Sequence, residues 1–214
     1  MNASRNHLLT ILASGLMAFA SPSGAAAFQE ASINARLDSC DPAVVRAAAD
    51  EVYRDPKSLK EPATFYQASM SLALTGQNEQ AGLLYLTARL RMSRQAYVEK
   101  GDRGQVLAVL EMVVSPLVMP TLWADPALAR RLVQRVIEWD RVTPDAILSS
   151  EAAKTPENKK KLAEIDAALA RFPDQIRDDP NRAVKLQAMV KEATHHINLI
   201  VPTRCSAEKR GRAK

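Results

Sequence analysis

The stretch FYQASMSLALTGQNEQAGLLYLTARLR (residues 65–91) predicts two helices that fold back on each other at Gly76. Beyond Gly76, apolar and small side chains recur at positions i, i+3, i+4, i+7 and i+11, which places them on one face of a helix. These side chains are Ala81, Leu84, Tyr85, Ala88 and Met92. Small side chains allow two helices to approach closely, and aromatic side chains fill the groove between them. The stretch therefore indicates a helical hairpin.

Proline positions predict further helices on both sides of this hairpin. A proline follows Asp, Glu or Thr before six helix-forming stretches: Asp41-Pro42, Glu61-Pro62, Asp125-Pro126, Thr143-Pro144, Thr155-Pro156 and Asp179-Pro180. Proline suits the first helical position because its missing N–H would have no partner there, and Asp or Thr before it caps free amides. No alternating pattern typical of a β-strand is longer than a few residues. We expect an all-α fold, an irregular bundle of about seven helices.

One stretch, QVLAVLEMVVSPLVMPTLW (residues 105–123), is apolar nearly all round, with Glu111 as its single charge. A membrane span is one interpretation. A buried charge and two prolines, Pro116 and Pro120, argue against it. We expect a central buried helix that ends near Pro116.

The hairpin resembles a single tetratricopeptide unit over residues 62–93. The residues that match this unit are the aromatic pair Phe65-Tyr66, Gly76 at the turn, and Ala81, Tyr85 and Ala88 in the second helix. One repeat period further along, the pattern is absent, whereas a solenoid needs at least about three stacked units. The resemblance implies one isolated hairpin inside the bundle and not a repeat array. Such a hairpin either forms a peptide-binding groove or packs the core.

Two other stretches, LLYLTARLR (residues 83–91) and VIEWDRVTPD (residues 136–145), are similar to a group of small exported helical proteins from proteobacteria. The resemblance implies a location in the bacterial envelope. It carries no functional residues over to this chain.

The start of the chain is typical of a secretory signal peptide. Arg5 and His7 precede an uncharged apolar run of 13 residues from Leu8 to Ala20, too short to span a bilayer, and small residues follow at 25–27. The sequence therefore predicts a periplasmic or secreted protein. Its expected parts are a cleaved signal peptide (1–27), a single helical domain (28–205) and a basic flexible tail (206–214).

Export determines how the two cysteines are interpreted. An oxidising compartment favours pairing, so we expect a disulfide between Cys40 and Cys205, at opposite ends of the domain. No Cys-x-x-Cys motif is present, which favours a structural bond over a redox site.

The formal charge of +5 is mainly a property of the two ends. Arg5 leaves with the signal peptide and residues 206–214 carry a net +3, so about +1 remains on the domain. We therefore expect no nucleic-acid partner, and no integral membrane span after signal cleavage.

The histidines offer a candidate metal site. Glu192 lies three residues before His195 and four before His196, so a carboxylate and an imidazole can share a helical face. A complete site needs ligands from another helix, and sequence cannot place candidates such as Glu111 or Glu138. Two polar residues at a helix edge are the alternative explanation.

Arginines supply the strongest surface signal. Arg89, Arg91 and Arg94 follow one helix, and guanidinium groups recognise acidic partners through paired hydrogen bonds. We interpret these three as a partner-binding set. The alternative is that arginines of this chain, which include Arg130 and Arg135, pair with its own acids or are solvated.

These observations favour a protein that is not an enzyme, has no cofactor and acts by binding another envelope protein. An immunity or inhibitor protein and an envelope accessory factor are two versions of this hypothesis. The alternatives are a metal-dependent protein or enzyme that uses Glu192, His195 and His196, and a purely structural envelope protein. The sequence indicates neither the partner nor the oligomeric state.

Overall fold

The structure is a computed structural model that describes residues 22–39, 41–55, 61–99, 101–143 and 145–211, with side chains from Gln29 to Ile197. All regular structure in these residues is helical, which confirms the all-α prediction. The helices are α1 (Pro22–Leu37), α2 (Pro42–Arg54), α3 (Pro62–Leu74), α4 (Asn78–Glu99), α5 (Arg103–Ala124), α6 (Pro126–Val142), α7 (Ala146–Ser149), the 3₁₀ helix η2 (Ala152–Lys154), α8 (Pro156–Arg177) and α9 (Arg182–Gly211).

The described part has about nine α-helices where we expected about seven. One of the additional helices, α7, is a single turn of four residues, too short for apolar periodicity to reveal it. Another, α1, begins inside the segment assigned to the signal peptide.

Several sequence predictions concern residues that the structure does not describe. These are Cys40, the side chain of Cys205, residues 1–21 of the expected signal peptide and residues 212–214 of the expected tail. The expected cleavage point near Ala27 falls within α1, and residues 206–211 fall within α9, in both cases where side chains are not described. The signal peptide, the disulfide and the flexible tail remain predictions.

Four helices begin at the prolines that the sequence identified: Pro42, Pro62, Pro126 and Pro156. The Asp41 carboxylate accepts a hydrogen bond from the backbone N–H of Ala43 at 2.8 Å, and Asp125 accepts one from Leu128 at 2.9 Å. These bonds satisfy amides that have no partner inside the helix. Pro144 is not described, and α9 begins two residues after Pro180.

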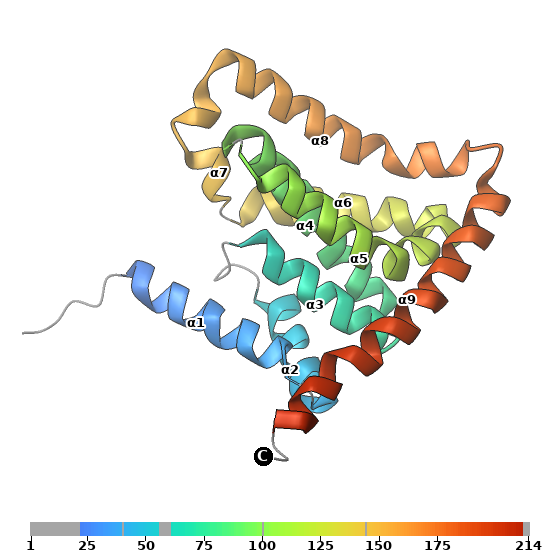
Figure 1. The fold of residues 1–214 in the computed structure, drawn as a ribbon. Coiled ribbons are helices and arrows are strands. Elements are labelled where there is room, and N and C mark those ends of the chain that lie inside the picture. Colours follow the sequence, from blue (N-terminus) through green and yellow to red (C-terminus); the bar gives the residue numbers. More distant parts are fainter. Residues whose placement is uncertain (1–21, 40, 56–60, 100, 144, 212–214) are drawn as a thin grey trace, which may run out of the picture.

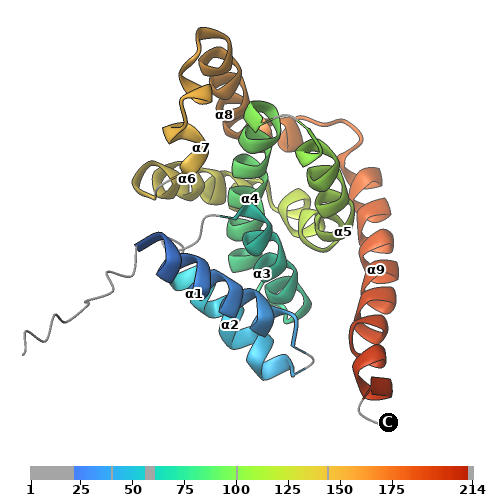
Figure 2. The same ribbon diagram turned by 60° about the vertical axis from the view of Figure 1, so that its left-hand side comes forward.

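The hairpin of α3 and α4 forms the centre of the molecule (Figures 1 and 2). Gly76 joins the two helices with a φ of +79°, a left-handed conformation that favours glycine. The predicted stripe on α4 is confirmed, because all five of its side chains are fully buried. Helices α1 and α2 pack on the α3 side, while α5, α6 and α8 pack against α4.

Helix α5 differs from the prediction. It does not end near Pro116 but continues through Pro116 and Pro120 to Ala124. Its second half is buried, and this packing outweighs the backbone hydrogen bonds that prolines remove. The first half is not central: Val109 is 54% exposed and Met112 is 62% exposed. By length and composition α5 is able to cross a membrane, the one such helix in the described part.

Helix α9 lies beside α5 (Figure 2). Its first residue, Arg182, donates hydrogen bonds to the carbonyl oxygens of Trp123 (2.8 Å) and Ala124 (2.6 Å) at the end of α5. A cation at a helix C-terminus satisfies free carbonyls and the helix dipole. The start of α9 is thereby fixed against the end of α5.

Candidate functional site

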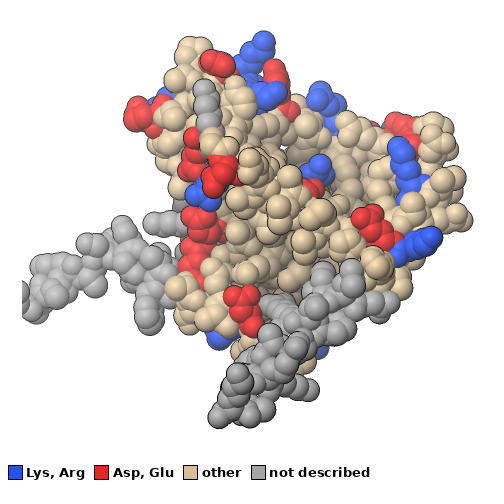
Figure 3. Space-filling model, in the orientation of Figure 1, with Lys and Arg blue, Asp and Glu red and all other residues tan. Residues whose placement is uncertain are grey.

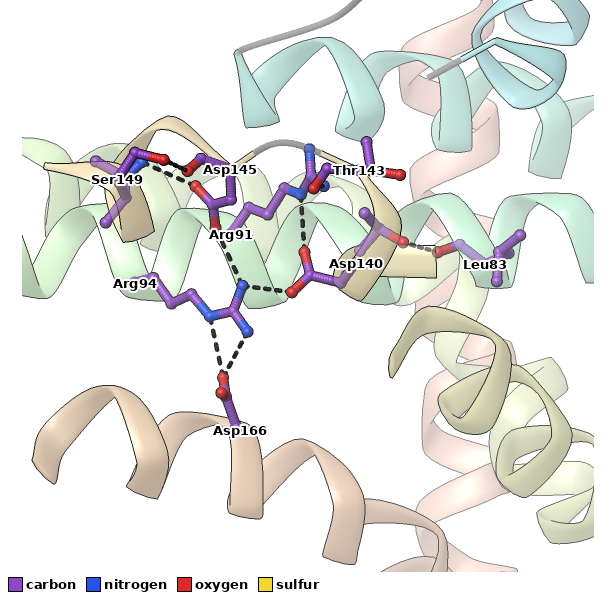
Figure 4. A network of polar contacts seen from close by, with 10 residues as sticks. Leu83, Arg91, Arg94, Asp140, Thr143, Asp145, Ser149 and Asp166 are labelled. Atoms are coloured by element: carbon purple, nitrogen blue, oxygen red, sulfur yellow. Dashed lines mark hydrogen bonds and ion pairs between the residues drawn. The ribbon is translucent and has the colours of Figure 1, made fainter. Parts of the chain in front are cut away.

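A network of buried charges joins four helical segments (Figure 4). Its cations are Arg91 and Arg94, three residues apart on one face of α4, and each residue is no more than 3% exposed. Its anions come from the end of α6 (Asp140), the residue before α7 (Asp145) and α8 (Asp166).

Arg94 binds all three carboxylates. Its Nη1 donates to Asp140 Oδ2 at 2.6 Å and to Asp145 Oδ2 at 3.0 Å. Its Nε and Nη2 donate to Asp166 Oδ1 at 3.0 and 2.7 Å. Burial opposes the charged form of Arg94, but Asp140 and Asp166 outweigh burial and raise the pKa of this guanidinium above its ordinary value. Arg94 therefore stays charged and connects α4 to α6, α7 and α8.

Arg91 completes the network on the side of the hairpin. It donates to Asp140 Oδ1 at 3.1 Å and to the carbonyl oxygen of Thr143 at 3.3 Å. Its guanidinium also lies 5.6 Å from the centre of the Phe65 ring, a cation–π contact. Asp140 is therefore shared between two guanidinium groups.

A cavity of about 780 Å³ opens beside this network between α4, α6, α7 and α8. Arg94, Asp140, Asp145 and the exposed Arg141 form its charged part, and Asp166 lies at the rim with a side chain that is 49% exposed. The apolar part consists of Leu90, Ile137, Val142, Leu148 and Leu169. Because the guanidinium groups already bind the carboxylates, we interpret the network as a structural connection between helices.

A second polar cluster joins α3, α4 and α5. The Glu111 carboxylate accepts hydrogen bonds from the Tyr66 hydroxyl at 2.5 Å and the Tyr85 hydroxyl at 2.7 Å. Arg89 Nε lies 3.6 Å from the same carboxylate. Burial and the charge of Glu111 raise the pKa of both tyrosines well above their ordinary value. Glu111, the single charge between residues 105 and 123, is thus satisfied by the hairpin.

The surface around α5 is largely apolar. Its exposed apolar side chains, Val106, Val109 and Met112, recur at intervals of three residues. A groove of about 240 Å³ between α4 and α8 has mainly apolar walls that include Leu86, Leu90 and Phe172. Figure 3 shows few charged side chains over α5 and a hollow beneath α8.

The predicted partner-binding arginines are separated by the fold. Arg91 and Arg94 are buried and bind carboxylates of this chain, whereas the Arg89 side chain is 44% exposed and borders the groove between α4 and α8. The alternative reading, pairing within the chain, describes Arg91 and Arg94. It also describes Arg135, which binds Glu79 at 3.0 Å.

The candidate metal ligands lie on α9, where Glu192 and His195 are exposed and His196 is half-buried. His196 Nε2 is 3.8 Å from Glu192 Oε1, and His195 is exposed. The described residues contain no group of three or more His, Cys, Asp or Glu side chains able to hold a metal. Glu192 and Glu111 both line a cavity of about 360 Å³ between α5 and α9. The sequence alone could not place Glu111 near Glu192.

Sequence reasoning missed the acids of the buried network. One signal was present: LLYLTARLR ends at Arg91, and VIEWDRVTPD contains both Asp140 and Asp145. These two stretches meet in this network. The chain matches no protein-family model, no curated protein and no solved structure.

Proposed function

We propose that this chain is an exported, non-enzymatic protein of the bacterial envelope that binds a partner protein through the exposed apolar face of α5. The partner places an apolar helix on Val106, Val109 and Met112 and extends toward the groove between α4 and α8. An immunity or accessory role fits this mode of action. The exposed face of α5 is the observation that carries the proposal.

An apolar helix face is unfavourable when it is exposed to water. A soluble helix normally turns its apolar side chains toward the core, and a cluster of exposed ones marks an interaction site. Helix α5 has a buried second half and an exposed apolar first half, so one end anchors it while the other end offers a surface. A helix laid into a groove is a common way to cover such a surface.

The α3–α4 hairpin supplies a rigid support for this surface. It resembles a tetratricopeptide unit, and the matching side chains of Phe65, Tyr66, Ala81, Tyr85 and Ala88 are buried. In this proposal those residues hold the two helices together, and the partner binds to helices packed outside them.

Export belongs to the same proposal. The signal-peptide pattern and the resemblance to exported helical proteins of proteobacteria both support the periplasm as the compartment. A disulfide between Cys40 and Cys205 follows from that compartment, and thiol titration of protein from its native host measures it directly.

Site-specific photo-crosslinking tests the proposal. A photoreactive amino acid replaces Val109 in one variant and Val142 in another, and both are expressed in the native host. Val142 is a matched control because it is 65% exposed and lies on α6. We expect a discrete crosslinked protein from position 109, and its loss when Val106→Ser is added.

Two outcomes contradict the proposal. One is the same set of crosslinked proteins from both positions. The other is crosslinking from position 109 to lipid alone, which identifies a membrane surface as the partner. Arg89→Ala is an additional variant for the same crosslinking measurement. Arg89 is the most exposed of the three arginines predicted to bind a partner, and its substitution leaves the network around Arg91 and Arg94 intact.

A further inference from the structure

The cavity between α5 and α9 collects methionine side chains. Five methionines follow residue 27, and three of them, Met112, Met119 and Met189, line this single cavity of about 360 Å³. Met112 also belongs to the apolar face proposed for the partner, whereas Met119 and Met189 do not.

The three thioethers come from two helices that pack against each other. Met112 and Met119 lie on one side of α5, two turns and about 10.5 Å apart along the helix axis. Met189 faces them from α9. Rotation about the Cα–Cβ and Cβ–Cγ bonds moves the sulfur of a methionine, so sulfur atoms at these positions can turn toward a common centre.

Burial changes progressively across this group. Met119 is 8% exposed, Met189 is partly buried and Met112 is 62% exposed. The cavity therefore leads from solvent to a thioether in the interior.

The chemistry of the walls defines which ligand fits. Neutral thioethers are soft ligands that select soft ions, Cu(I) in particular, over Mg²⁺ or Ca²⁺. The carboxylates of Glu111 and Glu192 line the same cavity and supply negative charge near a bound cation.

We propose that Met112, Met119 and Met189 form a binding site for a soft monovalent cation, Cu(I) or Ag(I), between α5 and α9. The fixed contact of Arg182 with the end of α5 holds the two helices in register for this site. A bound ion would link the first half of α5, which is otherwise exposed, to α9.

Metal titration of the full-length chain tests the site. Thiols and imidazoles also bind these ions, so Cys40→Ser and Cys205→Ser are present throughout, and His195→Ala with His196→Ala forms a separate variant. Cu(I) is titrated without oxygen against a colorimetric Cu(I) chelator, and Ag(I) is titrated by calorimetry. We expect one equivalent of either ion, affinity lowered about tenfold or more by each Met→Leu change, and no binding by the triple variant.

Leucine conserves the volume of methionine, so the variants are expected to fold. Met92→Leu is the matched control, because Met92 is fully buried in α4 outside the cavity. Methyl resonances of ¹³C-labelled methionine give an independent measurement on the unmodified chain: Ag(I) should shift those of Met112, Met119 and Met189 but not those of Met70 and Met92. Unchanged affinity in the triple variant, or loss of binding in the histidine variant, overturns the proposal.

Discussion

Helices α4 and α5 have 22 residues each and lie side by side. The helix with more charged residues, α4, is nevertheless the more buried of the two. Helix α4 carries Arg89, Arg91 and Arg94 and is buried along most of its length. Helix α5 is almost free of charge between residues 105 and 123, yet the side chains of its first half are largely exposed.

The difference shows that neighbours decide burial more than composition does. Helix α4 is surrounded by α3, α5, α6 and α8, and its arginines enter the interior because carboxylates are placed to receive them. Helix α5 has α4, α3 and α9 as its main neighbours, which leaves one face of its first half uncovered. A charged helix can thus form the centre of a fold, and an apolar helix can present a surface.

Arg94→Ala is expected to cause the largest loss in the free energy of unfolding. It leaves the buried carboxylate of Asp145 without its cation and leaves Asp140 with Arg91 alone, and breaking a buried pair in this way typically costs about 3–5 kcal/mol. Urea unfolding followed by circular dichroism measures the loss. Arg130→Ala, at the exposed pair with Asp174, is the control and should cost no more than about 1 kcal/mol. Equal losses in the two variants would mean that the burial of α4 does not depend on its charges.

Alkaline pH should reveal how α5 is attached to the hairpin. Tyr66 and Tyr85 hold their protons more tightly when folded, because burial and Glu111 raise the pKa of each hydroxyl above 10.0. Their contribution is therefore fully present below pH 10.0 and is lost as the pH rises, by about 1.4 kcal/mol per pH unit for each tyrosine.

The measurement is the free energy of unfolding between pH 9 and 11 for the natural chain and for Tyr66→Phe with Tyr85→Phe. The two proteins differ only at these two hydroxyl groups, so the difference in slope isolates the tyrosines. The natural chain should lose stability more steeply. Parallel curves would show that the two hydroxyls are ionisable in the folded protein and that Glu111 is not held as described.

Glycine-to-alanine substitutions should change the free energy of unfolding in opposite directions on α4 and α5. A Cβ at Gly82 of α4 would lie 2.8 Å from Cδ1 of Leu132, which is fully buried, so Gly82→Ala should destabilise by about 1 kcal/mol despite the better helix propensity of alanine. Gly104 of α5 has open space around its Cα, and Gly104→Ala should stabilise by about 0.5–1 kcal/mol. Thermal unfolding compares the two. A stabilising Gly82→Ala would show that α4 is packed less tightly than its neighbours imply.

The parts of the fold that the sequence predicted correctly depend on local signals. A proline after a capping residue marks a helix start within one or two positions, and the stripe from Ala81 to Met92 specifies a buried face by spacing alone. The α3–α4 hairpin could be predicted from the sequence for this reason.

The parts that were missed depend on residues far apart in the chain. Arg94 and Asp166 are separated by 72 positions, so no local pattern connects them. The end of α5 was misplaced because a proline weakens a helix locally, whereas burial of Leu117, Val118 and Leu122 stabilises it through other helices. The candidate arginines were divided between interior and surface by the same long-range contacts.

Val109→Ser should have the smallest effect on stability. Its side chain is 54% exposed on α5, so the free energy of unfolding is expected to change by no more than about 0.5 kcal/mol, as measured by urea unfolding. Val142→Ser, on the exposed side of α6, is the control and should behave in the same way. A loss well above 1 kcal/mol for Val109 alone would mean that another part of this chain covers the first half of α5. In that case α5 would be as enclosed as α4, the contrast between the two helices would disappear, and this face would no longer be free to receive a partner.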